Sequence, residues 1–320
     1  MSAHPVQRPD ILRAVCFLLL AGVCTLCLIA AYSAAKTEPA SLAEPKDVPL
    51  SARISNYDQV ISDIRHGLHD HAAYITVSFS YSENIQKELT AVVADWMEEA
   101  LEETDDPAEG DYIRYQSGGY EIACTCKPAA EGRYQYTVKI TPEHYTYLAQ
   151  EEEVSAAIAE LEESFGFTAE TSEYEKISAI YSWVCDHVKY DAVHRNNDHA
   201  HLRSTAYAAV IWRTAACQGY SVTLYRLLRE AGIGCRVVTG TAQKVDSSPE
   251  FHAWNIVELE GKWYHLDATW DAGRENWDYF LRGSESLTDH TLGKSFVDKG
   301  FASRYAISET DHPDRSITLG

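Results

Sequence analysis

The chain has 320 residues and a formal net charge of −21, with 45% apolar and 23% charged residues. This is the composition of a globular protein that can bury a core, and the length suits one or two domains plus a targeting element. The acidic balance argues against nucleic acid as a partner, because contacts to phosphate need clustered Lys and Arg.

The N-terminal segment is strongly apolar. It has no charged residue from Ala14 to Ala35, and Arg8 and Arg13 precede it. Such a stretch is long enough to span a bilayer, and its basic flank predicts that the rest of the chain lies outside the cytoplasm. Ser33-Ala34-Ala35 resembles a signal-peptide cleavage site. Residues 1–35 are therefore predicted to be either a membrane anchor or a cleaved signal peptide, which makes the protein single-pass or secreted.

Residues 36–52 hold three prolines and form a predicted linker. Residues 53–149 predict a small α+β domain, with strands near 73–79, 120–126 and 134–140 and a helix over 85–102. Cys124 and Cys126 occupy one of these strands and are interpreted as packing residues, because i and i+2 cysteines cannot easily form a disulfide.

Residues 150–320 form the second predicted domain. An acidic helix is expected over 151–163 and another over 172–188, where Ser172 and Glu175 have the spacing of a capping box. Cys185 and Cys235 occupy predicted core positions. Five cysteines lie outside the apolar segment, so at least one thiol has no intramolecular partner, and Cys217 is the natural candidate.

Cys217 lies where a helix is predicted to begin. The apolar face of that helix includes Tyr220 and Leu224, and Gly232 follows its end. The unpaired N–H groups and positive dipole end of a first helical turn stabilise a thiolate and can face the oxyanion of a tetrahedral intermediate. Gly219 is expected to let the backbone approach a substrate.

A predicted β-hairpin supplies a histidine and an aspartate. Residues 251–259 and 262–267 alternate like strands around a two-residue turn at Glu260-Gly261. If Leu259 pairs with Lys262, His252 and Asp267 share one face within reach of each other, whereas a three-residue loop would separate them. Asp271 is the rival carboxylate, beyond the expected end of the strand.

These segments resemble the transglutaminase-like superfamily, a papain-related cysteine-enzyme fold, and in particular its exported bacterial members. The resemblance covers about 172–291 and rests on three motifs in order: Cys217-Gln218-Gly219-Tyr220, His252-Ala253-Trp254-Asn255 and Asp267-Ala268-Thr269-Trp270-Asp271. It implies a catalytic triad of Cys217, His252 and Asp267.

The resemblance also suggests which residues contribute to the oxyanion or substrate site. Tyr207 is expected to help at the oxyanion site, and Gln218, Gly219 and Trp254 to lie near the substrate. The sequence departs from the family pattern at Gln218, where an acidic residue is usual, and at Trp212-Arg213, where many members have an Asn-Gly turn.

The predicted fold is thus α+β, with a papain/transglutaminase-like C-terminal domain and a smaller N-terminal α+β domain. The predicted function is cysteine acyl transfer on protein or cell-wall peptide amides. Water as acceptor makes the protein a peptidase or amidase, and an amine makes it a transglutaminase. The alternative is a catalytically silent cell-surface binding or scaffolding module.

No cofactor is predicted. Several histidines crowd one region, but their spacing matches no zinc pattern, so no metal site is predicted there. They are His187, His194, His199 and His201.

Overall fold

The structure is a computed structural model that describes residues 49–54, 56–193, 200–244 and 247–314. The fold is α+β, as predicted. The described residues form two compact units: the first takes in those up to 67 with 72–100 and 119–143, and the second takes in those of 68–71, of 101–118 and from 144 to 314.

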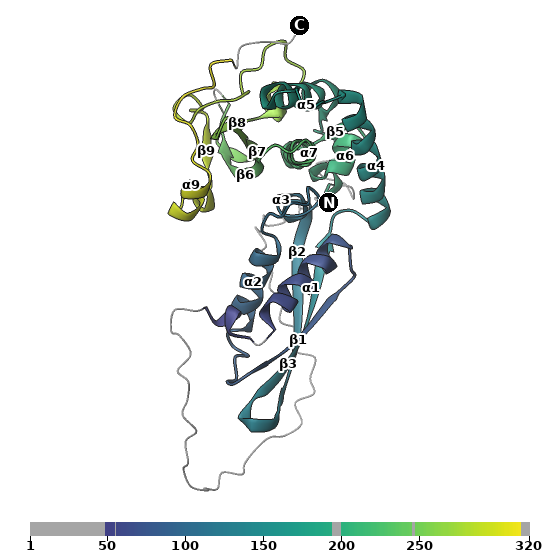
Figure 1. The fold of residues 1–320 in the computed structure, drawn as a ribbon, viewed down its shortest axis with the longest axis vertical. Helices are drawn as coiled ribbons and strands as arrows, with labels where there is room; N and C mark the ends of the chain where they lie inside the picture. The colour runs from purple at the N-terminus through teal and green to yellow at the C-terminus, as the bar shows by residue number, and fades with distance from the viewer. Residues whose placement is uncertain (1–48, 55, 194–199, 245–246, 315–320) are drawn as a thin grey trace, which may run out of the picture. The chain divides into compact units, whose positions relative to one another are not determined.

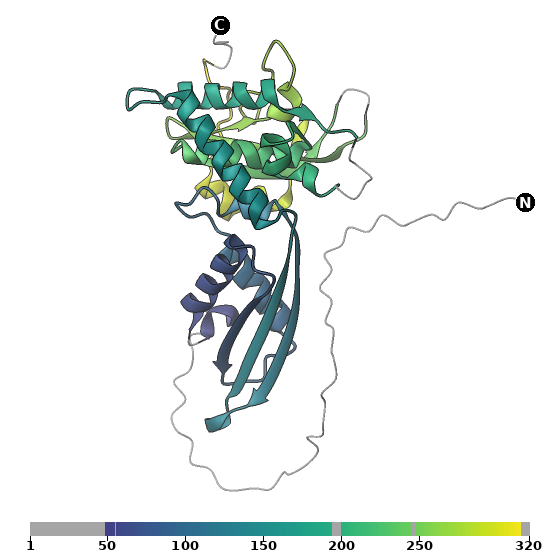
Figure 2. The same cartoon turned by 90° about the vertical axis from the view of Figure 1, so that its right-hand side faces the viewer.

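The first unit is a three-stranded sheet with helices on one face (Figure 2). Its strands lie in the order β1-β3-β2, and β1 pairs antiparallel with β3 from Ile75↔Ile140 to Tyr81↔Tyr134. Alternate residues of β1 are buried, and Phe79 meets the edge of Trp96 of α2 at 5.1 Å. The elements that lie wholly or mostly in this unit are η1 (Leu50–Arg53), α1 (Tyr57–His69), β1 (Ile75–Tyr81), α2 (Leu89–Ala100), β2 (Ser117–Pro128), η2 (Ala130–Gly132) and β3 (Tyr134–His144).

The second unit is built around a helix that packs on a four-stranded sheet with the strand order β8-β7-β6-β9 (Figure 1). Its helices are α3 (Asp111–Arg114), α4 (Leu148–Phe165), α5 (Glu173–His187), η4 (Leu202–Ser204), α6 (Ala206–Val210), α7 (Cys217–Glu230), α8 (Ala268–Asp271), η5 (Lys294–Phe296) and α9 (Lys299–Arg304). Its strands are β4 (Lys189–Tyr190), β5 (Thr214–Ala215), β6 (Cys235–Ala242), β7 (Glu250–Leu259), β8 (Lys262–Leu266) and β9 (His290–Leu292).

Helix α7 is the centre of this unit. Every residue from Gly219 to Leu228 is buried, including polar ones, because β6 and β7 cover one side and α5 and α6 cover others. Thr223 satisfies its buried hydroxyl by donating to the carbonyl of Gly219 at 2.7 Å. A helix buried on all sides holds its first residue rigidly, which matters for Cys217.

The predicted capping box is confirmed at the start of α5. The backbone N–H of Glu175 donates to the Ser172 hydroxyl, and the Glu175 carboxylate accepts from the backbone N–H of Ser172. Cys185 of α5 and Cys235 of β6 are buried free thiols, as predicted.

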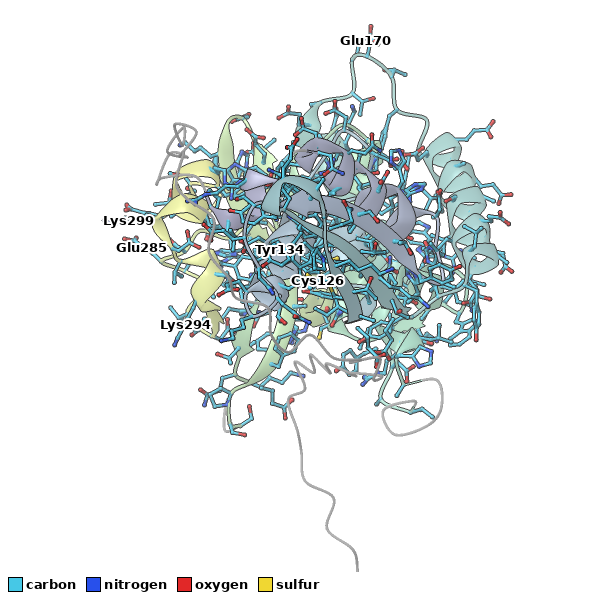
Figure 3. The ribbon with its side chains drawn as sticks, turned by 90° about the horizontal axis from the view of Figure 1, so that it is seen from below. Cys126, Tyr134, Glu170, Glu285, Lys294 and Lys299 are labelled. Carbon is cyan, nitrogen blue, oxygen red and sulfur yellow. The ribbon has the colours of Figure 1, made fainter. Side chains whose placement is uncertain are left out.

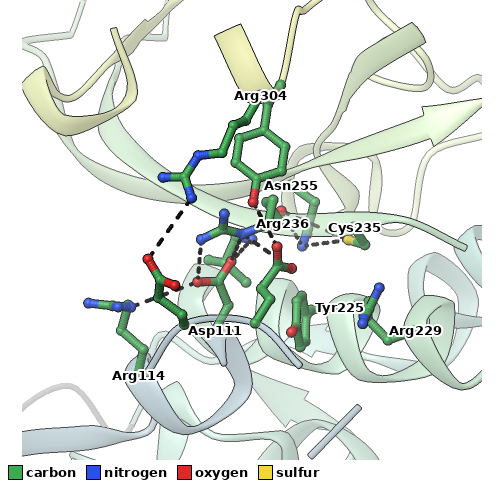
Figure 4. A network of polar contacts seen from close by, with 12 residues as sticks. Asp111, Arg114, Tyr225, Arg229, Cys235, Arg236, Asn255 and Arg304 are labelled. Atoms are coloured by element: carbon green, nitrogen blue, oxygen red, sulfur yellow. Dashed lines mark hydrogen bonds and ion pairs between the residues drawn. The ribbon is translucent and has the colours of Figure 1, made fainter. Parts of the chain in front are cut away.

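The division into units differs from the predicted boundary between 149 and 150, because residues 101–118 belong to the second unit. Asp111 of α3 is fully buried, and its carboxylate accepts two hydrogen bonds from Arg236 of β6, at 2.7 and 3.0 Å, and one from the backbone N–H of Val237 (Figure 4). A bidentate buried ion pair holds segments far apart in sequence together.

Charged side chains of the second unit extend into solvent. Lys294 and Lys299 stand out near α9, and Glu170 stands out at the turn between α4 and α5 (Figure 3). No helix in the described ranges is long and apolar enough to cross a membrane. The predicted anchor or signal segment at 1–35 and most of the predicted linker lie outside the described residues.

Candidate functional site

Cys217 is the first residue of α7 and is partly buried. The preceding Ala216 is anchored by its backbone N–H, which donates to the carbonyl of Arg203 at 2.7 Å. The first-turn N–H groups of a helix have no carbonyl partner within it, so the thiol lies beside backbone donors, as predicted.

Gly219 is a packing residue. A Cβ atom there would lie 2.7 Å from the Arg203 carbonyl oxygen and 2.9 Å from that of Thr205, so the 203–205 segment can pass α7 only against a glycine. The close backbone approach predicted for substrate is thus made by the chain itself.

The hairpin register follows the prediction. Leu259 pairs with Lys262, and both residues of the turn, Glu260 and Gly261, have positive φ angles of 53° and 73°, typical of a two-residue hairpin. The pairing ends at Asn255↔Leu266.

Asp267 differs from the prediction in its local structure. It caps the short helix α8 instead of continuing the strand: its Oδ1 accepts from the backbone N–H groups of Thr269 and Trp270 at 3.0 and 3.2 Å. The side chain competes with the sheet for the backbone at this point, which is characteristic of aspartate.

His252 and Asp267 form a buried, charge-assisted pair. The distance from His252 Nε2 to Asp267 Oδ2 is 2.7 Å, and the two side chains are 8% and 2% exposed. Burial raises the pKa of Asp267, but the charge and hydrogen bonds of His252 and His290 outweigh it and hold that pKa well below its usual range. The carboxylate is therefore ionised across the physiological range.

The Cys217 thiol lies close enough to the His252 imidazole to influence its pKa. Burial lowers the pKa of His252, but the charge and hydrogen bond of Asp267, followed by those of Cys217, outweigh it and raise this pKa to about 10. The imidazole is thus held in its charged form between a thiol and a carboxylate, the arrangement that favours a thiolate–imidazolium pair.

Asn255 sets the distance between the two elements that carry these groups. Its Nδ2 donates to the carbonyl of Ser221 at 3.0 Å, one helical turn after Cys217, and it lies three residues after His252 on β7. The amide therefore ties the start of α7 to the strand that bears the imidazole.

Asp271, the rival carboxylate, binds groups other than His252. Its oxygens accept from the Tyr181 hydroxyl at 2.7 Å and from the backbone N–H groups of Asp278 and Tyr279, both at 2.9 Å. Burial raises its pKa to about 6. Asp271 holds the 278–279 loop, while Asp267 holds His252.

Sequence reasoning missed His290 of β9. Its Nε2 lies 3.0 Å from the same Asp267 Oδ2 that binds His252. A three-residue strand has too little periodicity to be predicted, and no motif marks this histidine, so the sequence carries no signal for it.

Residues 164–268, which include Cys217, His252 and Asp267, match the family described as the transglutaminase-like superfamily. The chain contains a transglutaminase-like domain. Residues 269–314, which supply β9 and His290, follow the matched segment and pack in the same unit.

Among named relatives of this domain are the kyphoscoliosis peptidases of Homo sapiens and Mus musculus. Each is 36% identical over 112 residues, a match that covers 32% of this chain and 16% of the relative. The chain thus aligns with about a sixth of the length of these curated relatives.

Two solved structures are also similar to this chain. One is described as a TGase, with 19% identity, 60% of each chain covered and a TM-score of 0.34. The other is the periplasmic domain of TgpA from Pseudomonas aeruginosa, with 18% identity, 43% of this chain and 55% of that chain covered, and a TM-score of 0.29.

The other predicted site residues of the transglutaminase-like domain have packing partners. Tyr207 of α6 lies edge-on to Trp212 at 5.5 Å, and the Gln218 amide donates to the Tyr115 carbonyl. Trp254 is buried and stacks on the His252 ring at 5.9 Å, while its indole N–H donates to His265 Nδ1. Trp254 therefore supports the imidazole from inside the domain.

The turn before Cys217 explains one departure from the family pattern. Arg213 has a φ of 59°, a conformation that asparagine and glycine adopt at lower cost. Its guanidinium lies 4.6 Å from the Trp183 ring and its carbonyl accepts from the backbone N–H of Lys189, contacts that offset the strain.

By distance alone, one group of three among the described residues could hold a metal ion: nitrogens of His252 and His290 and an oxygen of Asp267 lie within 4.8 Å of one another. The same atoms already form hydrogen bonds of 2.7 and 3.0 Å, which account for their arrangement without an ion.

Proposed function

We propose that the transglutaminase-like domain is a cysteine acyl-transfer enzyme that acts on protein or peptide amides. The observation that carries the proposal is the buried 2.7 Å contact between His252 Nε2 and Asp267 Oδ2, with the Cys217 thiol near enough to the imidazole to raise its pKa. In this proposal Cys217 is the nucleophile, His252 moves the proton and Asp267 fixes the imidazole.

The reaction begins when the Cys217 thiolate attacks the amide carbonyl carbon and forms a tetrahedral oxyanion. The α7 N-terminal N–H groups lie beside the thiol and can stabilise that oxyanion. The oxyanion collapses to a thioester as His252 protonates the leaving amine, and water or a second amine then releases the acyl group. We favour water, because it is always present and its exclusion needs a closed site.

The location proposed for the enzyme is outside the cytoplasm, either anchored or secreted. This rests on the uncharged segment at 14–35 and the arginines that precede it. The kyphoscoliosis peptidase similarity supports a peptide substrate, and cell-wall peptide is the substrate we propose for an exported chain.

The test is the rate of Cys217 labelling by iodoacetamide from pH 5 to 10, read by peptide mass spectrometry. Because the pKa of His252 is raised, the imidazolium is present below about pH 10 and is lost as the pH rises through that value. Labelling of the wild-type protein should therefore persist to about pH 6. The buried thiols Cys185 and Cys235 are internal controls, since burial raises the pKa of each.

Two variants give the comparison. At pH 6.5 the His252→Ala protein should label about tenfold more slowly, because thiolate then forms only near a free-thiol pKa of about 8.5. Asp267→Asn should also slow labelling at pH 7, since it lets the pKa of His252 fall towards its usual value. Wild-type labelling that rises only near pH 8.5, unchanged by His252→Ala, would favour a catalytically silent binding module.

A further inference from the structure

His290 lies against the far side of the candidate triad. Its side chain is 1% exposed, and its Nε2 is 3.0 Å from Asp267 Oδ2. The ring centroid lies 5.3 Å from that of His252, and the rings of Trp270 and Trp254 pack at 4.6 and 5.0 Å. A ring so enclosed has one orientation.

His290 completes the set of donors to Asp267. Oδ1 accepts from the backbone N–H groups of Thr269 and Trp270, and Oδ2 accepts from His252 and His290. The carboxylate has about four lone-pair sites, and these four donors occupy them. Without His290, the backbone would still hold Oδ1, but Oδ2 would have His252 as its remaining partner in this set.

The other nitrogen of His290 is also fixed. Nδ1 lies 2.8 Å from Asp289 Oδ1, and the Tyr279 hydroxyl donates to Asp289 Oδ2 at 2.6 Å. Both ring nitrogens of His290 thus face carboxylate oxygens, which only accept hydrogen bonds. Both contacts are hydrogen bonds only when both nitrogens carry a proton.

The sheet brings the two histidines together. On β6, Gly240 pairs with His252 of β7, and Ala242 pairs with His290 of β9. Because residues two apart on a strand share a face, both rings lie on the same side of the sheet. A Cβ at Gly240 would lie 2.0 Å from the Thr291 carbonyl oxygen, so glycine is needed for β9 to approach.

We propose that His290 is a positioning residue for acyl transfer: by holding Asp267 Oδ2, with Asp289 and Tyr279 behind it, it fixes the carboxylate that orients His252. This inference rests on the proposed function. His290 acts through Asp267 and does not need to touch the substrate. Without the His290 side chain, the Asp267 carboxyl group can rotate while the backbone N–H groups still hold Oδ1. This rotation moves Oδ2, the atom that accepts from His252 Nε2.

The titratable groups around this position come from several elements. They are Cys217 from α7, His252 from β7, His265 from β8, Asp267 before α8, Tyr279 from the following loop and Asp289 before β9. Burial and the charge of His290 lower the pKa of His265 to about 3, so His265 stays neutral and accepts from Trp254.

The test compares His290→Leu and His290→Gln in the full-length protein, again by Cys217 labelling with iodoacetamide against pH, in the presence of EDTA. Leucine removes the donor, so the imidazole loses its orientation. Labelling at pH 6.5 should fall about tenfold or more, and its onset should move towards about pH 8.5. Glutamine can still donate to Asp267 Oδ2 and should restore the wild-type onset.

His312→Leu is the matched control. His312 is a buried histidine of the same unit that packs between Tyr174 and Tyr264, so its replacement should lower the unfolding temperature without moving the labelling onset. A purely structural role for His290 would give that same result.

The outcomes separate the two proposals. If wild-type labelling depends on His252 but a folded His290→Leu protein keeps the wild-type profile, the positioning role is wrong and the acyl-transfer proposal stands. If the leucine variant does not fold, the glutamine variant decides: a profile moved as far as that of His252→Ala contradicts the proposal. If wild-type labelling is independent of His252, both proposals fail.

Discussion

At the scale of single residues, Gln218 shows how a departure from a family motif can be accommodated. Its side-chain amide donates to the carbonyl of Tyr115, which lies in the 101–118 segment of the same unit. An acidic residue at position 218 has no proton to donate at neutral pH. The glutamine can therefore donate to the Tyr115 carbonyl, which an ionised acidic residue could not do.

Gln218→Glu should consequently destabilise the protein. The variant loses one hydrogen bond and places a carboxylate against a carbonyl oxygen, so we expect the free energy of unfolding to fall by about 1 to 2 kcal/mol. Urea unfolding at pH 7 measures this. Gln218→Ala, which loses the bond without the repulsion, is the control and should lose less. Equal stability of the Gln218→Glu and wild-type proteins would mean that this contact is not formed in solution.

The sequence predicts part of the candidate site, because the positions of His252 and Asp267 depend on a turn between neighbouring strands. The two-residue turn at 260–261 fixes the register of β7 and β8 up to Asn255↔Leu266, and Asp267 follows directly after Leu266, within 2.7 Å of His252. His290 has no such rule, since its strand is three residues long and its position depends on pairing with β6, far away in sequence.

At the scale of elements, the predictions are likewise correct where neighbouring residues specify the structure. The capping box of α5 and the start of α7 at Cys217 are specified by neighbouring residues. The strand expected over 262–267 forms over 262–266, and Asp267 then starts α8, because its side chain caps the backbone two and three residues ahead. At Asp267, side-chain capping of a helix competes with strand pairing. The alternation of apolar residues in the sequence indicates the strand but carries no sign of the cap.

A buried ion pair links α3 to β6 in the second unit. Arg236 binds Asp111 in a bidentate manner (Figure 4). Its guanidinium also lies 4.7 Å from the Tyr305 ring and 3.3 Å from the Glu103 carboxylate. Burial raises the pKa of Glu103 despite this positive neighbour. Removal of the arginine leaves Asp111 and Glu103 without the cation that they share, while Arg114 keeps a longer contact of 3.9 Å to Asp111.

Arg236→Met should therefore lower the free energy of unfolding by about 3 to 5 kcal/mol, the usual cost of an uncompensated buried charge. Arg304→Met is a matched control, because Arg304 is 62% exposed and lies 4.0 Å from Glu102, so its loss should cost less than about 1 kcal/mol. Denaturant unfolding at pH 7 compares the two. Similar small losses in both variants would show that the buried pair is replaced by water-mediated contacts.

At the scale of the whole molecule, the sequence predicts a single boundary between the two domains, at 149/150. In the structure each unit is made of several separate segments of the chain. The second unit takes in 101–118 because Asp111 pairs with Arg236 and Gln116 accepts from the backbone N–H of Ala206. These partners lie 125 and 90 residues away along the chain. No periodicity or linker composition reports such distant pairing, so a boundary at 149/150 was the natural prediction.

The discontinuous unit makes a prediction about truncated chains. Residues 150–320 alone lack α3, which leaves Arg236 without its buried partner and α6 without the Gln116 contact, so this fragment should not fold cooperatively. The Gln116 carbonyl accepts from the backbone N–H of Tyr145 at 3.2 Å, so the chain ends at 118 and 144 lie close together. A chain of 101–118 joined to 144–320 by an Asn-Gly turn should therefore recover a cooperative thermal transition and the wild-type labelling profile of Cys217. Cooperative unfolding of 150–320 alone would contradict this account, because it would make the 101–118 segment dispensable to the unit that holds the site.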